Sequence, residues 1–359
     1  MSTHRATITD VARAAGVSPS TASVVFSGKT PVSDATRRRV LDAAAELGYT
    51  GPDPRAASLR RGRSGIVGVV FEGHLGAAFL DPVKTLMMDG LADGVASLGA
   101  GLLLLRDYIG SDGLHSAGGP LGTEPTLTTA PLDAAVLIGC SGTLRESLDV
   151  VKARGIPVVV IEGDAGEGVP QIRLDNREAQ RQAASHLRSL GHTDVAIVTL
   201  PLDNARERGW MTPEREAAIT IDVTRHRLRG ARDVFPDAPA YVSAGSFIDE
   251  GHAAGRLLFA RENRPTAVIA QSDLLAAGVI RAAEEAGLRV PDDVSVTGFD
   301  GIVVDGLSPY ELTTLVQPAT EKGRAAGQAV AAMLEGRDAA SLRFTCVFRE
   351  GNTAGPVPA

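Results

Sequence analysis

Residues 28–30 read Gly-Lys-Thr, the tripeptide with which many phosphate-binding loops end. In such a loop the lysine reaches the phosphates and the next hydroxyl group binds the magnesium ion. The same pattern requires a glycine five residues before Gly28, where this sequence has Ser23, and a strand leading into the loop. Residues 18–26 predict a helix instead. We therefore interpret residues 28–30 as the exit loop of a helix and not as a nucleotide site.

Other residue types that carry chemistry also lack the spacing that the chemistry needs. The sequence has no G-x-G-x-x-G after a predicted strand and no G-x-S-x-G elbow. Its two cysteines, Cys140 and Cys346, are too few for a disulfide framework and lack metal-ligand spacing. The sequence therefore predicts a binding protein that is not an enzyme, with no cofactor and no metal.

The composition is that of an ordinary globular protein. The chain has 359 residues, of which 44% are apolar, 22% charged and 4% aromatic, enough for two or three domains. It shows neither a signal-peptide pattern at its N-terminus nor an apolar run of about 20 residues that would span a membrane. We expect a cytoplasmic protein.

Charge is distributed unevenly along the chain. Residues 1–63 contain ten lysines and arginines and five acidic residues, a net charge of +5. Because the whole chain carries −7, the remainder carries −7 − 5 = −12. A small basic segment joined to a large acidic one is typical of a nucleic-acid-binding head on a separate body.

Capping signals divide the first 50 residues into three helices. Thr7, with Asp10 three residues later, begins the first helix, and Ser18 followed by Pro19 begins the second. Ser33 begins the third. Two short helices joined by a tight turn and followed by a bracing helix form the helix-turn-helix plan, and each cap offers backbone N–H groups to a DNA phosphate. The residues predicted to face the core are Val11, Ala12, Ala15, Val40, Leu41, Ala44 and Leu47.

The rest of the chain alternates short apolar runs with helical stretches. Runs such as GIVGVVF and IPVVVI are nearly continuously apolar, which is typical of parallel strands covered on both faces. Two such series predict an α/β body of two doubly wound parallel-sheet lobes, with a ligand bound beyond the strand ends, in the cleft between them. The predicted division is a head at 1–50, a linker at 51–63, lobe 1 at about 64–162 and 293–318, lobe 2 at about 163–292 and 319–350 (a body of 64–350), and a C-terminal tail at 351–359.

These features together resemble one known family. The stretch TITDVARAAGVSPSTASVVFSGKTPVSDATRRRVLDAAAELGY resembles the DNA-binding head of the lactose/galactose repressor (LacI) family, and the similarity continues at intervals to about residue 323. The resemblance implies a transcriptional regulator, usually a repressor, with a periplasmic-binding-protein-like body. It places Pro19, Ser20 and Val24 at base-reading positions in the major groove, where a valine suits a thymine methyl group. Thr21 and Ser23 match positions that contact the DNA backbone.

The resemblance also implies a hinge and a dimer. Ala56 and Leu59 match a hinge helix that pairs with its twin in a homodimer, with Leu59 as a wedge in the minor groove. The GPDP insertion lengthens the spacing from Tyr49 to Leu59 by one residue relative to the lactose repressor, which leaves the register of the hinge contacts open. The implied DNA target is a pseudo-palindromic double-stranded operator.

For the body, the resemblance implies an effector site. Arg227 matches an arginine that hydrogen-bonds the effector, and its rigid fork suits sugar hydroxyls or a carboxylate. Asp300 ends the run VTGFD and can accept two hydroxyl hydrogen bonds, whereas Asp273 is interpreted as the N-cap of the following helix. Gln317 matches a polar contact, and Ser272 stands where family members often have asparagine. The positions that match apolar walls of the cleft are Phe79, Leu174 and Phe247.

Three functions remain to be weighed. The first is a regulator that binds DNA and responds to a sugar or related metabolite, or alternatively to a nucleobase or nucleoside. The second is a solute-binding protein, which the basic head and the missing signal peptide disfavour. The third is an enzyme on a Rossmann-like fold, for which the sequence offers no motif. Either sign of the ligand's effect on DNA binding is compatible with the sequence.

Overall fold

The computed structural model divides the chain into two compact units, Met1–Gly65 and Ile66–Ala359, which we call the head and the body. Within the residues it describes, no helix combines the length and the apolar character needed to cross a membrane. Ala56, Leu59 and Cys140 lie outside the described residues. The structure describes residues 6–28, 30–51, 62–72, 75–107, 126–139 and 143–358.

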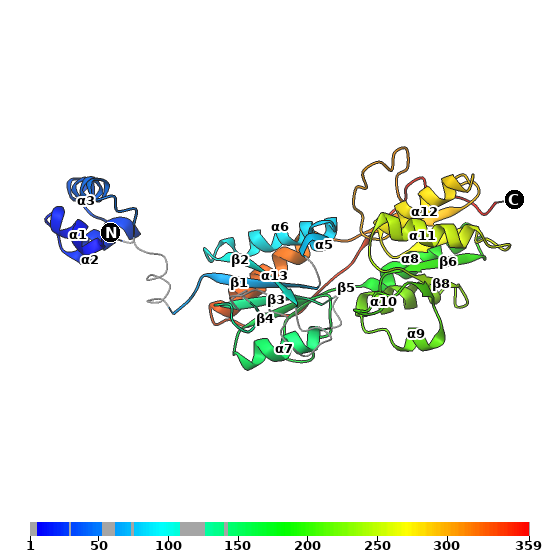
Figure 1. Ribbon diagram of the computed structural model, residues 1–359, viewed down its shortest axis with the longest axis horizontal. Helices are drawn as coiled ribbons and strands as arrows, with labels where there is room; N and C mark the ends of the chain where they lie inside the picture. Colours follow the sequence, from blue (N-terminus) through cyan, green and yellow to red (C-terminus); the bar gives the residue numbers. More distant parts are fainter. Residues whose placement is uncertain are drawn as a thin grey trace, which may run out of the picture. The chain divides into compact units, whose positions relative to one another are not determined.

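The head consists of α1 (Ile8–Ala14), α2 (Pro19–Ser27) and α3 (Asp34–Glu46), labelled in Figure 1. Each begins at the capping residue predicted from the sequence. The Thr7 hydroxyl accepts from the Asp10 amide at 3.4 Å while the Asp10 carboxylate accepts from the Thr7 amide at 3.0 Å, which completes a capping box. The Ser18 hydroxyl accepts from the Thr21 amide at 3.1 Å, and the Ser33 hydroxyl accepts from the Thr36 amide. The left-handed Gly28 ends α2, so residue 28 is a helix cap, as predicted.

The core of the head is small and built largely from alanine and valine. Val11, Ala12, Ala15, Val40 and Ala44 are buried as predicted, together with Ala22, Val25 and Ala43. Leu41 and Leu47 were predicted to face this core, but they are 44% and 41% exposed. The 3.6-residue period explains the difference, because Val40, Ala43 and Ala44 already fill the inner face of α3.

Lobe 1 of the body is a six-stranded parallel sheet in the order β12-β5-β4-β3-β1-β2. Helices α6 (Pro82–Ala96) and α13 (Ala319–Leu334) pack on one face, and α7 (Leu144–Ala153) packs on the other. The short α5 (Leu75–Phe79) precedes α6. The strands are β1 (Ile66–Glu72), β2 (Gly101–Asp107), β3 (Ala134–Ile138), β4 (Val158–Ile161), β5 (Gln171–Leu174) and β12 (Leu342–Phe344).

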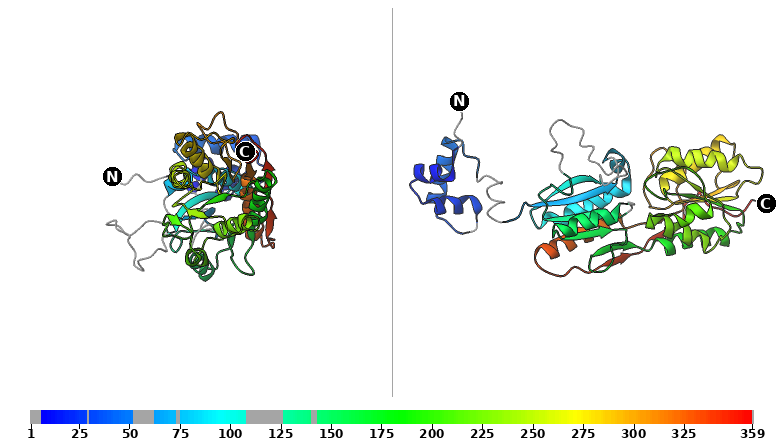
Figure 2. Two further views of the ribbon diagram at one scale, coloured as in Figure 1. Left: turned by 90° about the vertical axis from the view of Figure 1, so that its right-hand side faces the viewer. Right: turned by 60° about the horizontal axis from the view of Figure 1, so that its bottom comes forward.

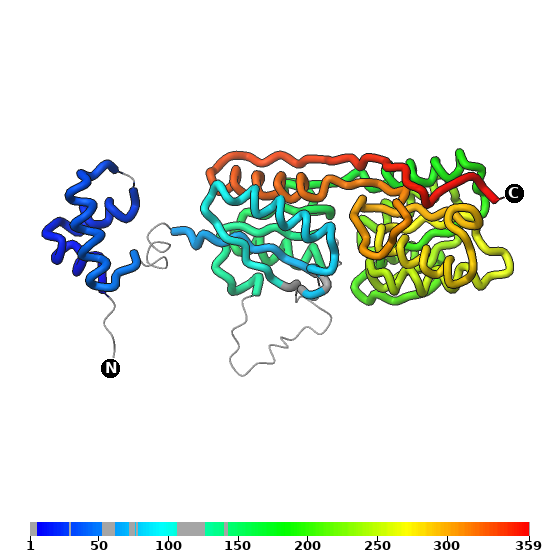
Figure 3. Tube along the Cα trace, turned by 90° about the horizontal axis from the view of Figure 1, so that it is seen from above, coloured from blue at the N-terminus to red at the C-terminus, as the bar shows by residue number. Residues whose placement is uncertain are grey.

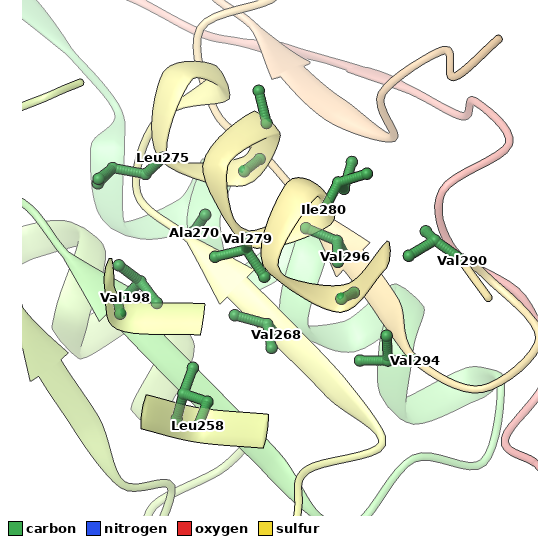
Figure 4. Packing of buried hydrophobic residues seen from close by; sticks show 14 of the residues in the cluster. Val198, Leu258, Val268, Ala270, Leu275, Val279, Ile280, Val290, Val294 and Val296 are labelled. Carbon is green, nitrogen blue, oxygen red and sulfur yellow. The ribbon is translucent and has the colours of Figure 1, made fainter. Parts of the chain in front are cut away.

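Lobe 2 has a second sheet in the order β10-β9-β6-β8-β7, parallel except for the antiparallel edge strand β7. Helices α8 and α10 cover one face, and α11 and α12 cover the other. Figure 4 shows Val268, Val279 and Val296 meeting in the core under α12. The elements are α8 (Asn176–Ser189), β6 (Val195–Thr199), β7 (Gly209–Trp210), α9 (Pro213–Ala217), α10 (Asp222–Arg232), β8 (Ala240–Val242), α11 (Ile248–Phe259), β9 (Ala267–Ala270), α12 (Asp273–Glu285) and β10 (Ser295–Thr297).

The chain passes between the lobes three times, at residues 174–176, 316–319 and 344–347. Next to the crossings, β11 (Thr314–Val316) pairs with β13 (Val347–Arg349), and the Asp175 amide donates to the Phe344 carbonyl at 2.9 Å. Figure 3 shows the last crossing as the red trace that runs from one lobe to the other.

Three parts of the predicted domain division are wrong. Lobe 2 was predicted to begin at residue 163, but β5 pairs with β4 and β12 in the sheet of lobe 1. Residues 293–318 were assigned to lobe 1, but β10 pairs with β9 in the sheet of lobe 2. Residues 319–350 were assigned to lobe 2, but α13 packs against α6 in lobe 1 and β12 joins the sheet of lobe 1. The helix and the strand belong to lobe 1 because the chain crosses from lobe 2 to lobe 1 at residues 316–319, whereas the predicted division placed a crossing at the same point in the opposite direction. Figure 2 shows α13 on the lobe 1 side of the body.

The segment that follows residue 350 is packed rather than a loose tail. The Thr353 side chain is fully buried, and its hydroxyl donates to the Val296 carbonyl at 2.7 Å. The Gly355 amide donates to the Ser295 hydroxyl at 3.0 Å. This segment therefore completes lobe 2 beside β10.

Helix α6 crosses α13 at a distance that glycine permits. A Cβ atom added at Gly90 would lie 1.9 Å from the Thr320 carbonyl oxygen, and one added at Gly323 would lie 1.9 Å from the Met87 carbonyl oxygen. These contacts involve backbone atoms, so the helices themselves would have to separate. Gly251 on α11 and Gly278 on α12 make the same kind of contact in lobe 2.

We expect Gly90→Ala to lower the free energy of unfolding of the body by about 1–3 kcal/mol, because the added methyl group overpacks the helix crossing. Gly76→Ala is the matched control, since Gly76 is also helical and a Cβ atom added there would meet nothing within 4 Å. The control should be neutral or slightly stabilising. Urea denaturation of both variants measures the difference, and equal stability of the two would contradict the close crossing.

Candidate DNA-binding helix and ligand cavity

The outer face of α2 carries short polar side chains. Pro19, Ser20 and Ser23 are exposed, whereas Thr21 and Val24 are half-buried. The inner face holds Ala22 and Val25, which are buried in the core of the head. The exposed polar side chains are therefore on the face of α2 that is free to contact base edges in a major groove.

Hydroxyl groups gather at the N-terminus of α2. The Ser18 hydroxyl lies 2.8 Å from the Ser20 hydroxyl and 2.8 Å from the Thr21 hydroxyl. The helix N-terminus adds backbone N–H groups without intrahelical partners, which favour an anion such as a phosphate. Thr7 and Ser33 provide similar capped N-termini on α1 and α3.

The body contains a cavity of about 140 Å³ between its lobes, at the carboxyl ends of the strands of both sheets. Lobe 1 contributes Ile138 from the end of β3 and Glu162 from the end of β4, and lobe 2 contributes Ser246, Ser272 and Asp300 from the ends of β8, β9 and β10. Carboxyl ends of parallel strands are where ligands bind in open α/β folds. The apolar lining is Val83, Met87, Ile138, Leu200, Pro201, Ile221 and Val223.

A closed ring of six polar side chains borders this cavity; we call it the lobe ring. On the lobe 2 side, Arg227 Nε donates to Asn176 Oδ1 at 2.9 Å, and its NH1 lies 3.5 Å from Asp300 Oδ1. Gln317 Nε2 donates to Asp300 Oδ1 at 2.6 Å. The members of the lobe ring, in order, are Arg227, Asn176, Glu162, Lys322, Gln317 and Asp300.

The lobe ring joins the two lobes. Lys322 on α13 donates to Gln317 Oε1 at 2.6 Å and forms an ion pair with Glu162, and Asn176 Nδ2 donates to Glu162 Oε2 at 2.8 Å. The bond from Asn176 crosses from α8 in lobe 2 to the end of β4 in lobe 1. All six side chains are buried or nearly so, so each polar group depends on its neighbour in the ring.

The pKa values of the two carboxyl groups in the lobe ring are shifted in opposite directions. Burial raises the pKa of Asp300 to about 8, although the nearby Arg227 charge opposes this shift. Burial also acts to raise the pKa of Glu162, but the charge and hydrogen bond of Lys322, helped by Arg227 and Asn176, outweigh it and hold that pKa below its usual value. Glu162 is therefore negatively charged at neutral pH, whereas Asp300 is largely protonated there.

Arg227 is anchored on three sides. Besides its contacts with Asn176 and Asp300, its NH1 donates to the Gln271 carbonyl at 2.6 Å, and the guanidinium lies 3.5 Å from the centre of the Phe299 ring. Such a stacked, forked group is held in one orientation and presents a fixed pattern of donors. The side chain is 5% exposed, at the edge of the cavity.

Four of the seven residues proposed from the sequence line the cavity together: Arg227, Ser272, Asp300 and Gln317. Phe79, Leu174 and Phe247 are not among the lining residues. Phe79 is 57% exposed at the end of α5, and Leu174 is buried beside Phe299 under the crossings. The Phe247 ring packs against Gly245. Their prediction as cavity walls is therefore wrong for this arrangement, in which aliphatic side chains form the apolar lining.

The N-cap of α12 is Ser272 and not Asp273, which was predicted to be the cap. Ser272 is the N-cap, because its hydroxyl accepts from the Leu275 amide at 3.2 Å. Asp273, predicted to be the cap, is the first helical residue and is fully buried. Its carboxylate accepts from the amides of Gly301 and Ile302 at 2.7 and 2.9 Å and so fixes the loop that follows Asp300. Burial raises its pKa to about 7.

Sequence reasoning missed Glu162, Asn176 and Lys322. Glu162 follows directly after the apolar run IPVVVI, so the rule that located Asp300 at a strand end applies to it as well. Asn176 follows β5 in the same way. Lys322 lies within an alanine-rich helix, where no sequence signal separates a buried lysine from a surface one.

A basic helix-turn-helix head joined to a two-lobed body with a cavity between the lobes defines the class of DNA-binding transcriptional regulators. Residues 7–51 match the model of the bacterial regulatory proteins of the lacI family, and residues 184–347 match a periplasmic binding protein-like domain. The chain is 34% identical over 336 residues to an HTH-type transcriptional regulator of Mycobacterium tuberculosis, covering 90% of each chain. The chain belongs to the LacI family of transcriptional regulators.

Solved structures agree with this assignment. A LacI family transcriptional regulator from Corynebacterium glutamicum is 27% identical, with a TM-score of 0.70 over 98% of this chain and 99% of that one. The transcriptional regulator CelR in complex with cellobiose is 25% identical, with a TM-score of 0.64 over 97% of this chain and all of that one. The predicted α/β class with an N-terminal helix-turn-helix head is confirmed.

Proposed function

We propose that this regulator binds a small effector in the cavity between its lobes and that the lobe ring couples binding in the cavity to the arrangement of the lobes. The observation that carries the proposal is the position of Arg227, Asp300 and Gln317, which contact one another and line the cavity at the same time. A ligand that hydrogen-bonds these groups must compete with bonds that link the lobes. It would thereby shift the population of lobe arrangements, which is the basis of allosteric control.

We propose a sugar or related metabolite as the effector. The complex of a 25% identical regulator with cellobiose supports this class. The forked guanidinium of Arg227 and the carboxyl group of Asp300 support it as well, because both can hydrogen-bond hydroxyl groups. A nucleobase or nucleoside is the alternative, although the lining residues that the structure describes include no aromatic side chain for stacking. Acting as a solute-binding protein is disfavoured, because the head is a DNA-binding module. The described lining also offers hydrogen-bonding groups such as Arg227 and Gln317, which suit ligand binding.

For the head, we propose that α2 enters the major groove and that a homodimer reads a pseudo-palindromic operator in the cytoplasm. One head has a small contact area, which two-fold symmetry doubles. Pro19, Ser20 and Val24 are the proposed base-reading residues, with Thr21 and Ser23 on the DNA backbone. Ser18, Thr7 and Ser33 are proposed to place helix N-termini against phosphates.

A screen tests the effector proposal directly. The purified full chain would be heated in the presence of sugars, nucleosides and related metabolites, and compounds that raise the Tm would then be added to the protein on operator DNA. A ligand that binds the native state raises the Tm by mass action. Stabilising compounds that leave the DNA affinity unchanged would contradict effector control.

We expect Val24→Arg to change the preferred DNA sequence, because arginine contacts guanine through two hydrogen bonds where valine offers only apolar contact. Discrimination at that base pair should change by about 1–3 kcal/mol. Selection from random DNA by wild type and variant measures it. Ala45→Arg is the control, because it adds the same charge on the exposed side of α3. An unchanged preferred sequence in Val24→Arg would contradict the placement of α2 in the groove.

A further inference from the structure

The body has a second cleft besides the cavity proposed for the effector, which we call the first cavity. The second cleft has a volume of about 530 Å³. Its described lining comes from the ends of β4 and β5 and from β12 in lobe 1, and from the start of α8 and from α10 in lobe 2. It includes Glu162 and Asn176 of the lobe ring, and its apolar side chains are Leu174 and Val223. A lining of this kind has little apolar surface against which to bury a neutral ligand.

On the lobe 1 side of the second cleft, two arginines lie side by side. Arg173 on β5 and Arg343 on β12 are partners in the register of the parallel strands, so their side chains leave the same face of the sheet from backbones about 4.8 Å apart. Arg173 Nε donates to Gln171 Oε1 at 2.8 Å, and its NH2 lies 3.6 Å from Asp164 Oδ1. Arg343 is exposed and has no hydrogen bond or ion pair in the part of the chain that the structure describes. Two like charges in register repel each other.

On the lobe 2 side, a second pair of arginines lies on α10. Arg225 and Arg229 are four residues apart, and both line the second cleft. Arg225 forms an ion pair with Asp222 and donates to the Ile219 carbonyl. The exposed Arg229 has neither a hydrogen bond nor an ion pair among the described residues. Like charges at this spacing destabilise a helix, so each lobe presents one arginine with partners and one without to the same cleft.

The second cleft also contains bonds that link the lobes. The Asp164 amide in lobe 1 donates to Asp222 Oδ2 in lobe 2 at 3.3 Å, and Asn176 Nδ2 donates to Glu162 Oε2 at 2.8 Å. Because its two walls belong to different lobes, the shape of the second cleft changes with the arrangement of the lobes. A ligand that contacts both walls therefore favours the arrangement in which it can reach both.

We propose that the second cleft is a binding site for a phosphate group, either inorganic phosphate or part of a small metabolite, held between Arg343 of lobe 1 and Arg229 of lobe 2. The inference goes beyond the proposed effector, because it assigns a second ligand to a different cleft. A guanidinium fork donates two parallel hydrogen bonds to phosphate oxygens. A dianion at this place also offsets the repulsion within both pairs of arginines.

Calorimetry on the full chain tests binding at constant pH. Inorganic phosphate, glucose 6-phosphate and adenosine monophosphate are the phosphate probes, and glucose and adenosine are their neutral counterparts. We expect at least one phosphate probe to bind with an affinity that falls as salt rises, and the neutral counterparts not to displace it. The inorganic and ester arms show which source of phosphate the cleft takes. Absence of binding by all three phosphate probes overturns the inference.

Variants place the phosphate in the second cleft. Arg343→Gln and Arg229→Gln should each weaken its binding by about tenfold or more, because each removes a charged donor. Arg145→Gln on α7 and Arg256→Gln on α11 are the matched controls, since both arginines are exposed, lack partners among the described residues and lie outside the described lining. Asp175→Asn removes a carboxylate from the described lining and should tighten binding. The inference fails if the controls weaken binding as much as Arg343→Gln does.

A further variant separates this inference from the proposed effector site. Lys84 lines the first cavity and is not in the described lining of the second cleft. Lys84→Gln should therefore leave phosphate binding within about twofold of the wild type. If Lys84→Gln weakens binding and Arg343→Gln does not, the phosphate binds in the first cavity, which overturns the inference and leaves the effector site in place. Phosphate should also raise the Tm of the wild-type body more than that of Arg343→Gln, and an equal rise in both contradicts the inference.

Discussion

Replacing Arg227 by alanine is expected to abolish the response of DNA binding to the effector while the ligand-free protein still binds its operator. Arg227 joins Asn176, Asp300 and the Gln271 carbonyl, and it is one of the donors that line the cavity from lobe 2. Its loss removes a ligand contact and opens the lobe ring at once. The head folds around its own core, so DNA contacts on α2 are not directly affected.

The loss should also be visible in stability. Removing one partner of a buried ion pair leaves the other uncompensated and costs about 3–5 kcal/mol. Because burial already raises the pKa of Asp300 to about 8, that carboxyl can take up a proton, and we expect the lower end of this range near neutral pH. Differential scanning calorimetry of the body transition, with titration of the effector found in the screen, measures both effects.

Arg229→Ala is the control for Arg227→Ala. Arg229 lies two residues further along α10, is exposed, and is not a member of the lobe ring. Its removal should leave ligand affinity and Tm nearly unchanged, since exposed substitutions lie within about 0.5 kcal/mol. If Arg227→Ala binds the effector as tightly as the wild type does, Arg227 has only a structural role, and the cavity must recognise its ligand through other groups.

The helix caps and the buried parallel strands were predicted correctly because their signals lie within a few neighbouring residues. The caps at Thr7, Ser18 and Ser33 depend on residues within one helical turn, so reading a few neighbours suffices. The same holds for Gly28, whose left-handed conformation ends α2. The apolar runs at β1, β4 and β9 predicted buried parallel strands for the same reason, because each is a continuous property of four to seven residues.

The lobe ring could not be derived in this way. Glu162 and Lys322 are 160 residues apart in the chain, and they meet only because α13 returns to lobe 1 after the second crossing. The sequence placed residues 319–350 in lobe 2, so the predicted division did not bring α13 and Lys322 onto the sheet that carries Glu162. Arg227 and Asp300 were identified through family resemblance, which transfers tertiary contacts that local patterns do not contain.

The predicted apolar walls of the cavity differ from the observed ones for a related reason. Phe79, Leu174 and Phe247 have suitable side chains, but their exposure depends on how loops leave the strands. Leu174 turns into the core beside Phe299 and Leu315 under the crossings.

Lys322→Met is expected to lower the free energy of unfolding of the body at neutral pH by about 3–5 kcal/mol, because it leaves Glu162 charged and buried without its ammonium partner. Both side chains are nearly inaccessible, at 2% and 7% exposure, so water cannot replace the lost contact. Arg324→Met is the control on the same helix. Arg324 forms a surface ion pair with Asp93, and its loss should cost less than about 1 kcal/mol.

The pH dependence of Lys322→Met distinguishes the lost charge from lost packing. In the wild type the pKa of Glu162 is lowered, so the ion pair contributes stability above the unfolded-state pKa, near 4.5, and loses it as pH falls through the folded-state pKa. In the variant, burial acts without Lys322 and raises the pKa of Glu162, so stability is instead lost as pH rises. The gap between wild type and variant should therefore be large at pH 7 and shrink toward pH 4.5. Adding Glu162→Gln to the variant should recover stability at pH 7. Urea denaturation across this range decides the point, since a gap that stays constant with pH would mean that Lys322 acts through packing alone.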